Sequence, residues 1–373
     1  MKKNYFMLAA TTMMLAACAQ TDVVNEIAVE ETPQAIGFET FANKVTRAEN
    51  SEETRTDGLG THHSDFNVWA YKDTYTQYVF NNEKVYLNGS TWKYDGAKYW
   101  DKAANKYEFY AAAPYNTKWK LIQVPDANQA SDYFVYENFE LLNTTIQSTE
   151  YVESFHGVNT QDLMIASRES VGESAILSGA TVELDFNHIL SRLNVTVKKS
   201  VNLVNESVNL TSISINKLFN IGTFNENDNV GHRWTLTQNV GSITGQAPSG
   251  VGSSSSYVIQ SLVMPQDVKY AAIDRNGVNN NETSEAYLYI TYTIGNEPFK
   301  VSYNLAHAFG AKEDDLSTDD SENIIAFKEG WQNTLNITID ADAIEFSAVT
   351  FKWDEHINTV NVPVIGTETE NTK

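Results

Sequence analysis

The chain has 373 residues, with 26 Lys or Arg against 48 Asp or Glu, which gives a formal net charge of −22. A chain this acidic repels phosphate backbones and has no local cluster of basic residues, so nucleic acid is excluded as a partner. The length favours about two domains. Beyond residue 18 no segment is apolar enough to span a bilayer, so a solvated, outward-facing protein is expected.

Residues 1–18 form a candidate export signal. Lys2 and Lys3 give a basic start, and the apolar run from Tyr5 to Ala17 is too short and too close to the terminus for a transmembrane helix. The small residues that end this run, followed by Cys18, resemble the lipobox of bacterial lipoproteins, in which the cysteine sulfur is lipidated. Because Cys18 is the single cysteine, no intramolecular disulfide can form. The alternative is an ordinary secretory signal with an incidental cysteine.

The segment 35–58 begins as a strand and continues as a polar stretch. Residues Ala35–Val45 alternate, with Ile36, Phe38 and Thr40 on the same side, as in a strand with one buried face. Arg47 and Arg55 follow in the polar stretch, which has the character of a protease site. A strand is therefore expected at the front of the mature chain, separated from the rest by a cleavable segment.

Short segments rich in β-branched and aromatic residues, bounded by Gly, Asn, Asp or Ser, continue through the rest of the chain, and helical periodicity is hard to find there. Val182, Leu184 and Phe186, for example, share one face of the first of these segments. The pattern predicts two β-sandwiches, with a boundary near residue 180, rather than an α/β enzyme core. The predicted strands lie in 181–186, 192–197, 210–215, 285–294, 299–305, 334–339 and 343–353.

The candidates for chemistry are few. His62 and His63 are adjacent and have no third ligand at a recognisable spacing, so an exposed polar turn is favoured over a metal site. The acidic stretch 313–322 lacks the glycine and the spaced glutamate of a calcium loop and is predicted to be a solvated loop, as is 241–256. Residues 354–356 contain acid and base types without a nucleophile motif. We therefore predict a protein that is not an enzyme and binds no cofactor or metal.

The segment 90–116 is unusually aromatic. Its rings, Trp92 and Trp100 among them, could form a stacking platform for sugars or the interior of a sandwich, and we favour the interior because aromatic side chains dominate core burial. By alternation, Tyr107 and Phe109 fall on one face of a strand and Tyr110 on the other. That arrangement predicts a core strand whose back is half-exposed.

Several motifs occur along the chain: Tyr99-Trp100 before a turn, residues 107–114 (YEFYAAAP), residues 184–195 (LDFNHILSRLNV), Gly330-Trp331, the strand 335–339, and Ile344, Val349 and Trp353. Together with the lipobox and the strand ahead of Arg47, they resemble the fimbrillin family of Bacteroidetes type V pili over nearly the whole chain. Asp101 departs from the family pattern, which often has proline after the aromatic pair.

The resemblance implies that the precursor is exported as a lipoprotein and that an Arg-specific surface protease removes its first strand. The exposed groove would then receive a strand from another subunit. Arg47 would be the cut site and Arg55 the alternative, and Ala35–Val45, with Ile36 and Phe38, would be the placeholder strand. The expected fold is all-β, with two transthyretin-like β-sandwich domains in tandem. The expected divisions are 1–18 signal, 19–47 propeptide, 48–180 N-terminal sandwich and 181–373 C-terminal sandwich.

The C-terminal tail is a candidate donor strand. Val360, Val362 and Val364 share one face and could fill successive pockets of a neighbouring subunit, although Pro363 must face outward. An intramolecular edge strand is an equally weighted alternative. The resulting function is a fimbrial stalk subunit for adhesion, anchored to the outer membrane before assembly, whose partners are other copies, related subunits, the protease and a possible host or bacterial ligand. A fimbrial anchor, a tip adhesin and a surface glycan-binding lipoprotein remain the alternatives.

Overall fold

The computed structural model describes most of the chain, and from Gln34 onward the chain belongs to one compact unit. The described residues are 33–42, 44–45, 54–55, 59–61, 63–73, 78–124, 132–142, 162–228, 233–237, 240–248, 250–269, 283–311, 324–352 and 363–364. Within these ranges, no helix is long and apolar enough to cross a bilayer.

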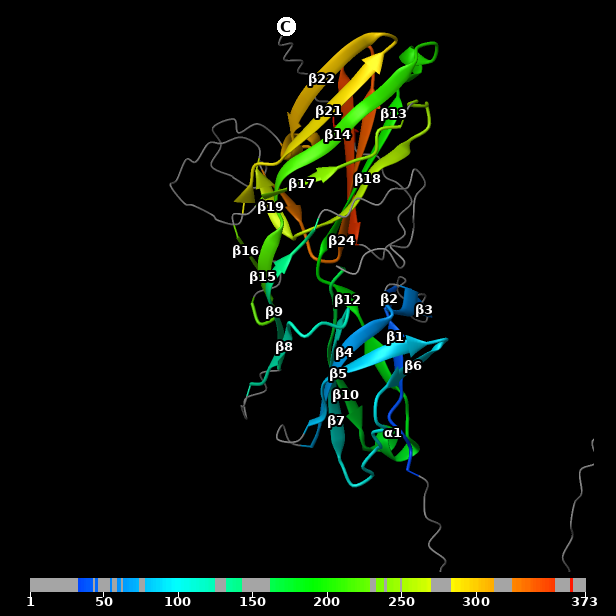
Figure 1. Cartoon of the computed structure of the whole chain (residues 1–373), viewed down its shortest axis with the longest axis vertical. Helices are drawn as coiled ribbons and strands as arrows, with labels where there is room; N and C mark the ends of the chain where they lie inside the picture. The colour runs from blue at the N-terminus through cyan, green and yellow to red at the C-terminus, as the bar shows by residue number, and fades with distance from the viewer. Residues whose placement is uncertain are drawn as a thin grey trace, which may run out of the picture. The chain divides into compact units, whose positions relative to one another are not determined.

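The fold is all-β, as the sequence predicts (Figure 1). A six-stranded antiparallel sheet has the order β12-β10-β7-β4-β5-β6. Its strands are β4 (Asp65–Lys72), β5 (Tyr78–Asn88), β6 (Thr91–Tyr94), β7 (Lys106–Ala113), β10 (Met164–Gly172) and β12 (Asn187–His188).

One face of this sheet is covered by two parallel strands, β1 (Phe38–Phe41) and β11 (Val182–Asp185). Their inward side chains form a core with those of β4, β5, β7 and β10. Val182, Leu184 and Phe186 all point into this core, which confirms the predicted face.

The opposite face packs against a four-stranded sheet of order β16-β15-β9-β8. Tyr110 of β7 therefore meets Phe134 across a second core, with ring centroids 6.3 Å apart. The prediction that the back of β7 is half-exposed is wrong, because this second layer leaves Tyr110 only 1% exposed. The strands of the layer are β8 (Trp119–Ile122), β9 (Tyr133–Glu140), β15 (Ile221–Asn225) and β16 (Trp234–Leu236).

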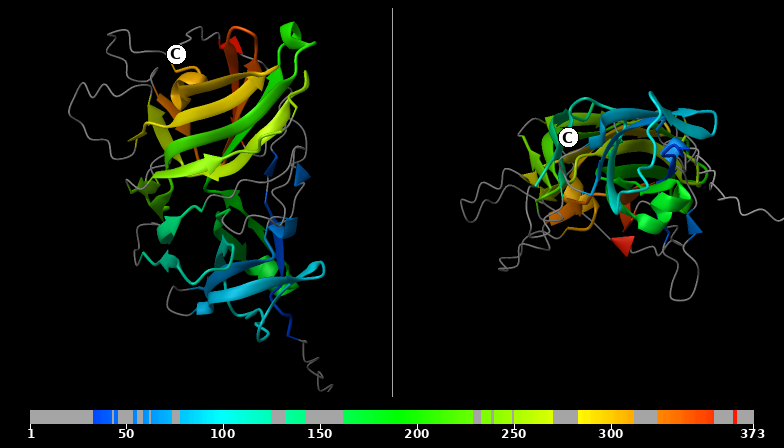
Figure 2. Two further views of the ribbon diagram at one scale, coloured as in Figure 1. Left: turned by 45° about the horizontal axis from the view of Figure 1, so that its top comes forward. Right: turned by 90° about the horizontal axis from the view of Figure 1, so that it is seen from below.

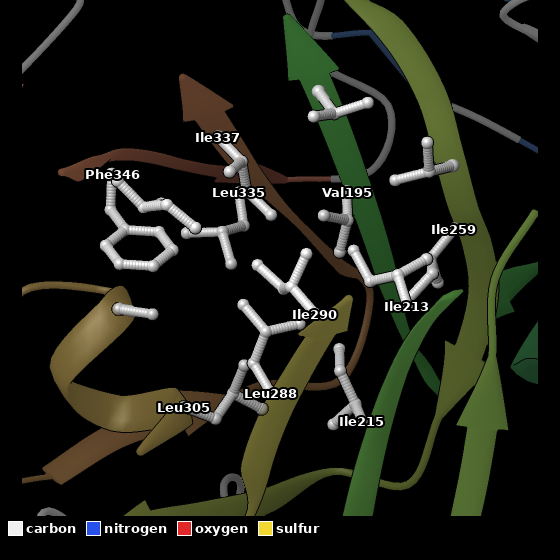
Figure 3. Packing of buried hydrophobic residues seen from close by; sticks show 14 of the residues in the cluster. Val195, Ile213, Ile215, Ile259, Leu288, Ile290, Leu305, Leu335, Ile337 and Phe346 are labelled. Carbon is white, nitrogen blue, oxygen red and sulfur yellow. The ribbon is translucent and has the colours of Figure 1, made fainter. Parts of the chain in front are cut away.

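A five-stranded sheet of order β18-β13-β24-β25-β26 faces a four-stranded sheet of order β17-β14-β21-β22 across a third core. Figure 3 shows Val195, Ile259 and Leu335 of the first sheet pointing toward Ile213 and Ile290 of the second. The strands are β13 (Ser191–Lys199), β14 (Val208–Phe219), β17 (Val240–Thr244), β18 (Ser256–Val263), β21 (Tyr287–Ile294), β22 (Glu297–Asn304), β24 (Trp331–Ile339), β25 (Ile344–Lys352) and β26 (Pro363–Val364).

The remaining elements are short; Figure 2 shows the whole chain from two further sides. The sequence did not predict α1 and α2, because helices of 6 and 4 residues are too short to show a helical period. These elements are β2 (Lys44–Val45), β3 (Thr54–Arg55), β19 (Gln266–Lys269), β20 (Thr283–Ser284), β23 (Ile324–Phe327), α1 (Glu173–Ser178), α2 (Leu305–Ala308), and the 3-10 turns η1 (Leu59–Thr61) and η2 (Val201–Leu203).

The prediction of a flexible loop over 241–256 is wrong in part. Its first residues belong to β17, which pairs with β14. Farther along, Val251 is buried and its N–H donates to the carbonyl oxygen of Val208 at 2.7 Å. The Gly- and Ser-rich composition conceals this order, because it comes from pairing with distant strands rather than from local propensity.

Candidate assembly site

The N-terminal strand is held by backbone hydrogen bonds along both of its edges. On one edge β1 pairs in parallel with β11, with Phe38 opposite Val182. On the other edge, the N–H of Ile36 donates to the carbonyl oxygen of Lys98 at 2.8 Å, and the N–H of Trp100 donates to that of Gln34 at 3.0 Å. The strand therefore lies in a slot between two segments that come much later in the chain.

Alternate side chains of this strand point into the core. Ile36 is 1% exposed, Phe38 7%, Thr40 5% and Ala42 0%, whereas Glu39 between them is exposed. This period of two is the signature of a strand with one buried face. The shared face predicted for Ile36, Phe38 and Thr40 is confirmed, and the buried face continues to Ala42.

Phe38 packs against four aromatic rings. Its ring lies edge-on to the rings of Phe66, Phe80, Tyr94 and Phe109, with centroid distances of 6.0, 5.5, 5.9 and 6.0 Å. Edge-to-face pairs at these distances are favourable beyond the area that they bury. The strand is thus built into the aromatic core of the six-stranded sheet.

Strand β6 supplies two polar contacts to the same strand. The hydroxyl of Tyr94 donates to the carbonyl oxygen of Ile36 at 2.7 Å, and the indole N–H of Trp92 donates to the hydroxyl oxygen of Thr40 at 2.9 Å. Burial raises the pKa of the Tyr94 phenol, which keeps the group protonated and able to donate. The sequence places Trp92 among the aromatic residues but does not predict this contact, because a hydrogen bond between residues far apart in the chain has no local signature.

The other predicted site residues fall partly outside the described residues. Cys18, Arg47, Val360 and Val362 all lie there. Arg55 belongs to β3, where its backbone pairs with that of Lys44. Of the predicted site residues with described side chains, Ile36 and Phe38 lie in the same core.

The end of the tail is described only at Pro363–Val364, as β26. Val364 stands opposite Phe346 at the edge of β25, and Pro363 stands opposite Ser347. The described end of the tail is thus paired within its own chain.

The aromatic segment 90–116 contributes to the core, which is the interpretation that the sequence favours. Trp100 is 6% exposed and its ring lies edge-on to that of Tyr107 at 4.8 Å, while Tyr99 is 51% exposed. One exposed ring beside buried and half-buried ones is a poor stacking platform for a sugar.

His63 corrects the expectation of an exposed polar turn, because it is only 6% exposed. Burial lowers the pKa of its imidazole, against the opposing effect of nearby Asp162. The Nδ1 atom of His188 lies 3.1 Å from a carboxylate oxygen of the same Asp162. The described residues contain no group of three His, Cys, Asp or Glu arranged to hold a metal ion. His62, residues 313–322 and residues 354–356 lie outside the described residues.

Comparisons with known proteins give the family. Residues 46–353 match the family model described as fimbrillin-like. The fimbrium subunit Fim1C of Phocaeicola vulgatus is 22% identical over an alignment of 220 residues, and the match covers 54% of this chain and 53% of that protein. The match thus spans about half the length of this relative. A solved fimbrial protein from Bacteroides vulgatus has a TM-score of 0.50 at 15% identity, covering 86% of this chain and 99% of that one; this likeness bears on the fold alone.

The family model extends from just after β2 to just after β25 and includes most of the three described cores, but not Ile36, Phe38 and Ala42 of the N-terminal strand. This chain belongs to the fimbrillin-like family.

Proposed function

We propose that this chain is a structural subunit of a fimbrium that assembles at the cell surface by strand exchange and serves adhesion. The observation that carries the proposal is the position of β1. It is one of two strands in the layer over the six-stranded sheet, and its alternate side chains belong to the core beneath. In the proposed precursor, lipid on Cys18 holds the chain at the outer membrane until assembly.

Loss of the N-terminal strand would create an unfilled groove. The edge of β11 would lose its parallel partner, the carbonyl oxygen of Lys98 would lose the N–H of Ile36, and the rings around Phe38 would face solvent. An open sheet edge above an apolar floor is a template for another strand. A donor from another copy or a related subunit would restore both the hydrogen bonds and the alternating side chains.

Cleavage after an arginine is the proposed trigger. Arg47 lies between β2 and β3, and a cut after it separates β1 and β2 from everything that follows. Arg55 is the alternative, but its backbone is paired with Lys44, so a protease must open that pair before it can bind the chain in extended form. While it remains attached, the placeholder strand has the advantage of a high effective concentration, which cleavage removes.

The tail from Thr359 onward is the proposed donor. Val360, Val362 and Val364 would present one apolar face to the groove of a neighbour. Seating an apolar side chain of this size contributes about 1.5 to 3 kcal/mol before ordering costs. In the part of the tail that the structure describes, β26 pairs with β25 through two residue pairs, and we expect their release to cost little by comparison.

The testing experiment is limited digestion of lipid-free precursor with an Arg-specific protease, followed over time by mass spectrometry and size analysis. A cut after Arg47 that converts monomer into a ladder of oligomers supports the proposal. Arg47→Ala should block this conversion, and Arg55→Ala is its matched control.

A folded chain that is cut cleanly but does not assemble contradicts a stalk subunit and favours an anchor or a tip adhesin. Resistance to cleavage at both arginines contradicts the proposed trigger. Binding on a glycan array by a chain that never assembles would instead favour the surface glycan-binding lipoprotein.

A further inference from the structure

Strand β6 donates two different kinds of hydrogen bond to the placeholder strand. Tyr94 donates to a backbone carbonyl, that of Ile36, and every strand offers such an acceptor. Trp92 donates to a side-chain oxygen, that of Thr40, and only some strands offer one at that position. The first contact therefore holds any strand, whereas the second depends on the sequence of the strand.

The surroundings make the second contact selective. Thr40 is 5% exposed, and the Trp92 ring lies edge-on to Phe66, with centroids 5.0 Å apart. An apolar residue at the position of Thr40 would take away the acceptor of a partly buried indole N–H. Leaving a buried donor without a partner costs more than the hydrogen bond contributes when it is made.

The neighbouring pocket adds a size requirement. Two residues before Thr40, Phe38 lies among four rings that all meet it at steep interplanar angles, between 66° and 89°. A small aliphatic side chain there would leave part of the space empty, and the surrounding rings would lose contacts with it.

We propose that Trp92 is a specificity-determining residue of the assembly groove. The groove selects a donor strand that has an aromatic residue followed, two positions later, by Ser or Thr. This inference rests on the proposed function. On its Val360, Val362 and Val364 face, the chain's own tail offers neither a ring nor a side-chain oxygen. The tail can still fill the groove of another copy, as proposed above, but the partner that fits this groove best is the donor segment of a different subunit carrying this pattern.

The test uses the full chain, cut at its arginine, with fluorescent peptides of residues 33–45 that replace the placeholder strand. Peptide binding is followed by anisotropy. The peptide with Thr40 and its Thr40→Ser variant should bind alike, and Thr40→Val, which keeps the shape, should bind about tenfold more weakly because the indole N–H loses its acceptor. A Glu39→Ala peptide is the control, because Glu39 is exposed.

Trp92→Phe supplies the decisive comparison, because it keeps a ring and removes the N–H. To this variant of the chain, the Thr40 peptide and the Thr40→Val peptide should bind equally. The role of Trp92 would be overturned if the Thr40 and Thr40→Val peptides bound equally to the unsubstituted chain. It would also be overturned if their difference in affinity persisted in the Trp92→Phe variant. A peptide of residues 357–369 should bind more weakly than the Thr40 peptide, and equal binding would overturn the proposed choice of partner.

The outcomes separate this inference from the function on which it rests. If a folded, cut chain exchanges its strand with no peptide, the vacated groove itself is refuted. If peptides exchange without regard to position 40, only the selectivity is refuted. The intact chain gives a second measurement that needs no cut: Thr40→Val and Trp92→Phe should be non-additive in urea unfolding, and additive effects would count against the contact.

Discussion

The ring of Phe38 stands edge-on to the ring of Phe80, with centroids 5.5 Å apart and planes inclined at 66°. A strand at the front of the chain thus completes the core of a sheet formed by later residues. The proposed precursor therefore depends for part of its stability on a segment that it later loses. Such a chain would be driven to accept a replacement strand, because the uncovered rings and sheet edge are unfavourable in water.

The contribution of Phe38 can be measured directly. Phe38→Ala in the uncut chain should lower the free energy of unfolding by about 3 to 5 kcal/mol, since it leaves a cavity among four rings. Urea unfolding followed by tryptophan fluorescence provides the measurement. Tyr99→Ala is the control, because Tyr99 is 51% exposed and should change stability by less than about 0.5 kcal/mol. An equal loss for both variants would contradict the packing described.

Removal of the tail tests its proposed role as donor. Deletion of Thr359–Lys373 should abolish oligomer formation after cleavage and leave the monomer folded, because β26 adds only two residue pairs to the edge of β25. Size analysis of the cut protein and urea unfolding of the uncut protein give the two readouts. Unchanged polymer formation would rule out the tail as donor, and a monomer that fails to fold would show that the tail is a structural edge strand.

His63 should make stability depend on pH. Burial lowers the pKa of its imidazole in the folded chain, so below about pH 6.5 the unfolded state binds the proton more readily than the folded state. Stability is then fully present above that pH and declines as the pH falls toward the folded pKa. The nearby groups Asp162, Asp65 and His188 act on the same imidazole.

The measurement compares urea midpoints of the unsubstituted chain and His63→Gln between pH 7.5 and pH 5. The variant should lose less stability over this interval, because glutamine does not titrate. Parallel curves for the two proteins would show that His63 does not contribute to the acid sensitivity.

Trp100 distinguishes a core role from a sugar-binding role. Because its ring is buried against Tyr107 and Phe109, Trp100→Ala should lower the free energy of unfolding by about 3 kcal/mol or more. Thermal and urea unfolding test this expectation. If the unsubstituted chain binds glycans on an array and a stable Trp100→Ala variant does not, the result would instead support a sugar-stacking platform.

Much of the fold could be predicted from local patterns. The period of two in residues 181–186 and in Ile36 and Phe38 determined which side chains are buried, because a strand places alternate residues on opposite faces. Short segments also gave the all-β class. The sequence did not predict helix α1, because it is too short to show a helical period. It did not predict strand β17, because that strand forms by pairing with β14.

The sequence alone determined that a strand stands at the front of the chain, which of its faces is apolar, and that arginines follow it. Only the tertiary structure decided where the strand lies: parallel to β11, beside Lys98, and in contact with Trp92 and Tyr94. Alternation specifies which way side chains point but not their partners, because pairing across many intervening residues is set by the packing of whole sheets. The same limit applied to His63, whose burial depends on residues far along the chain.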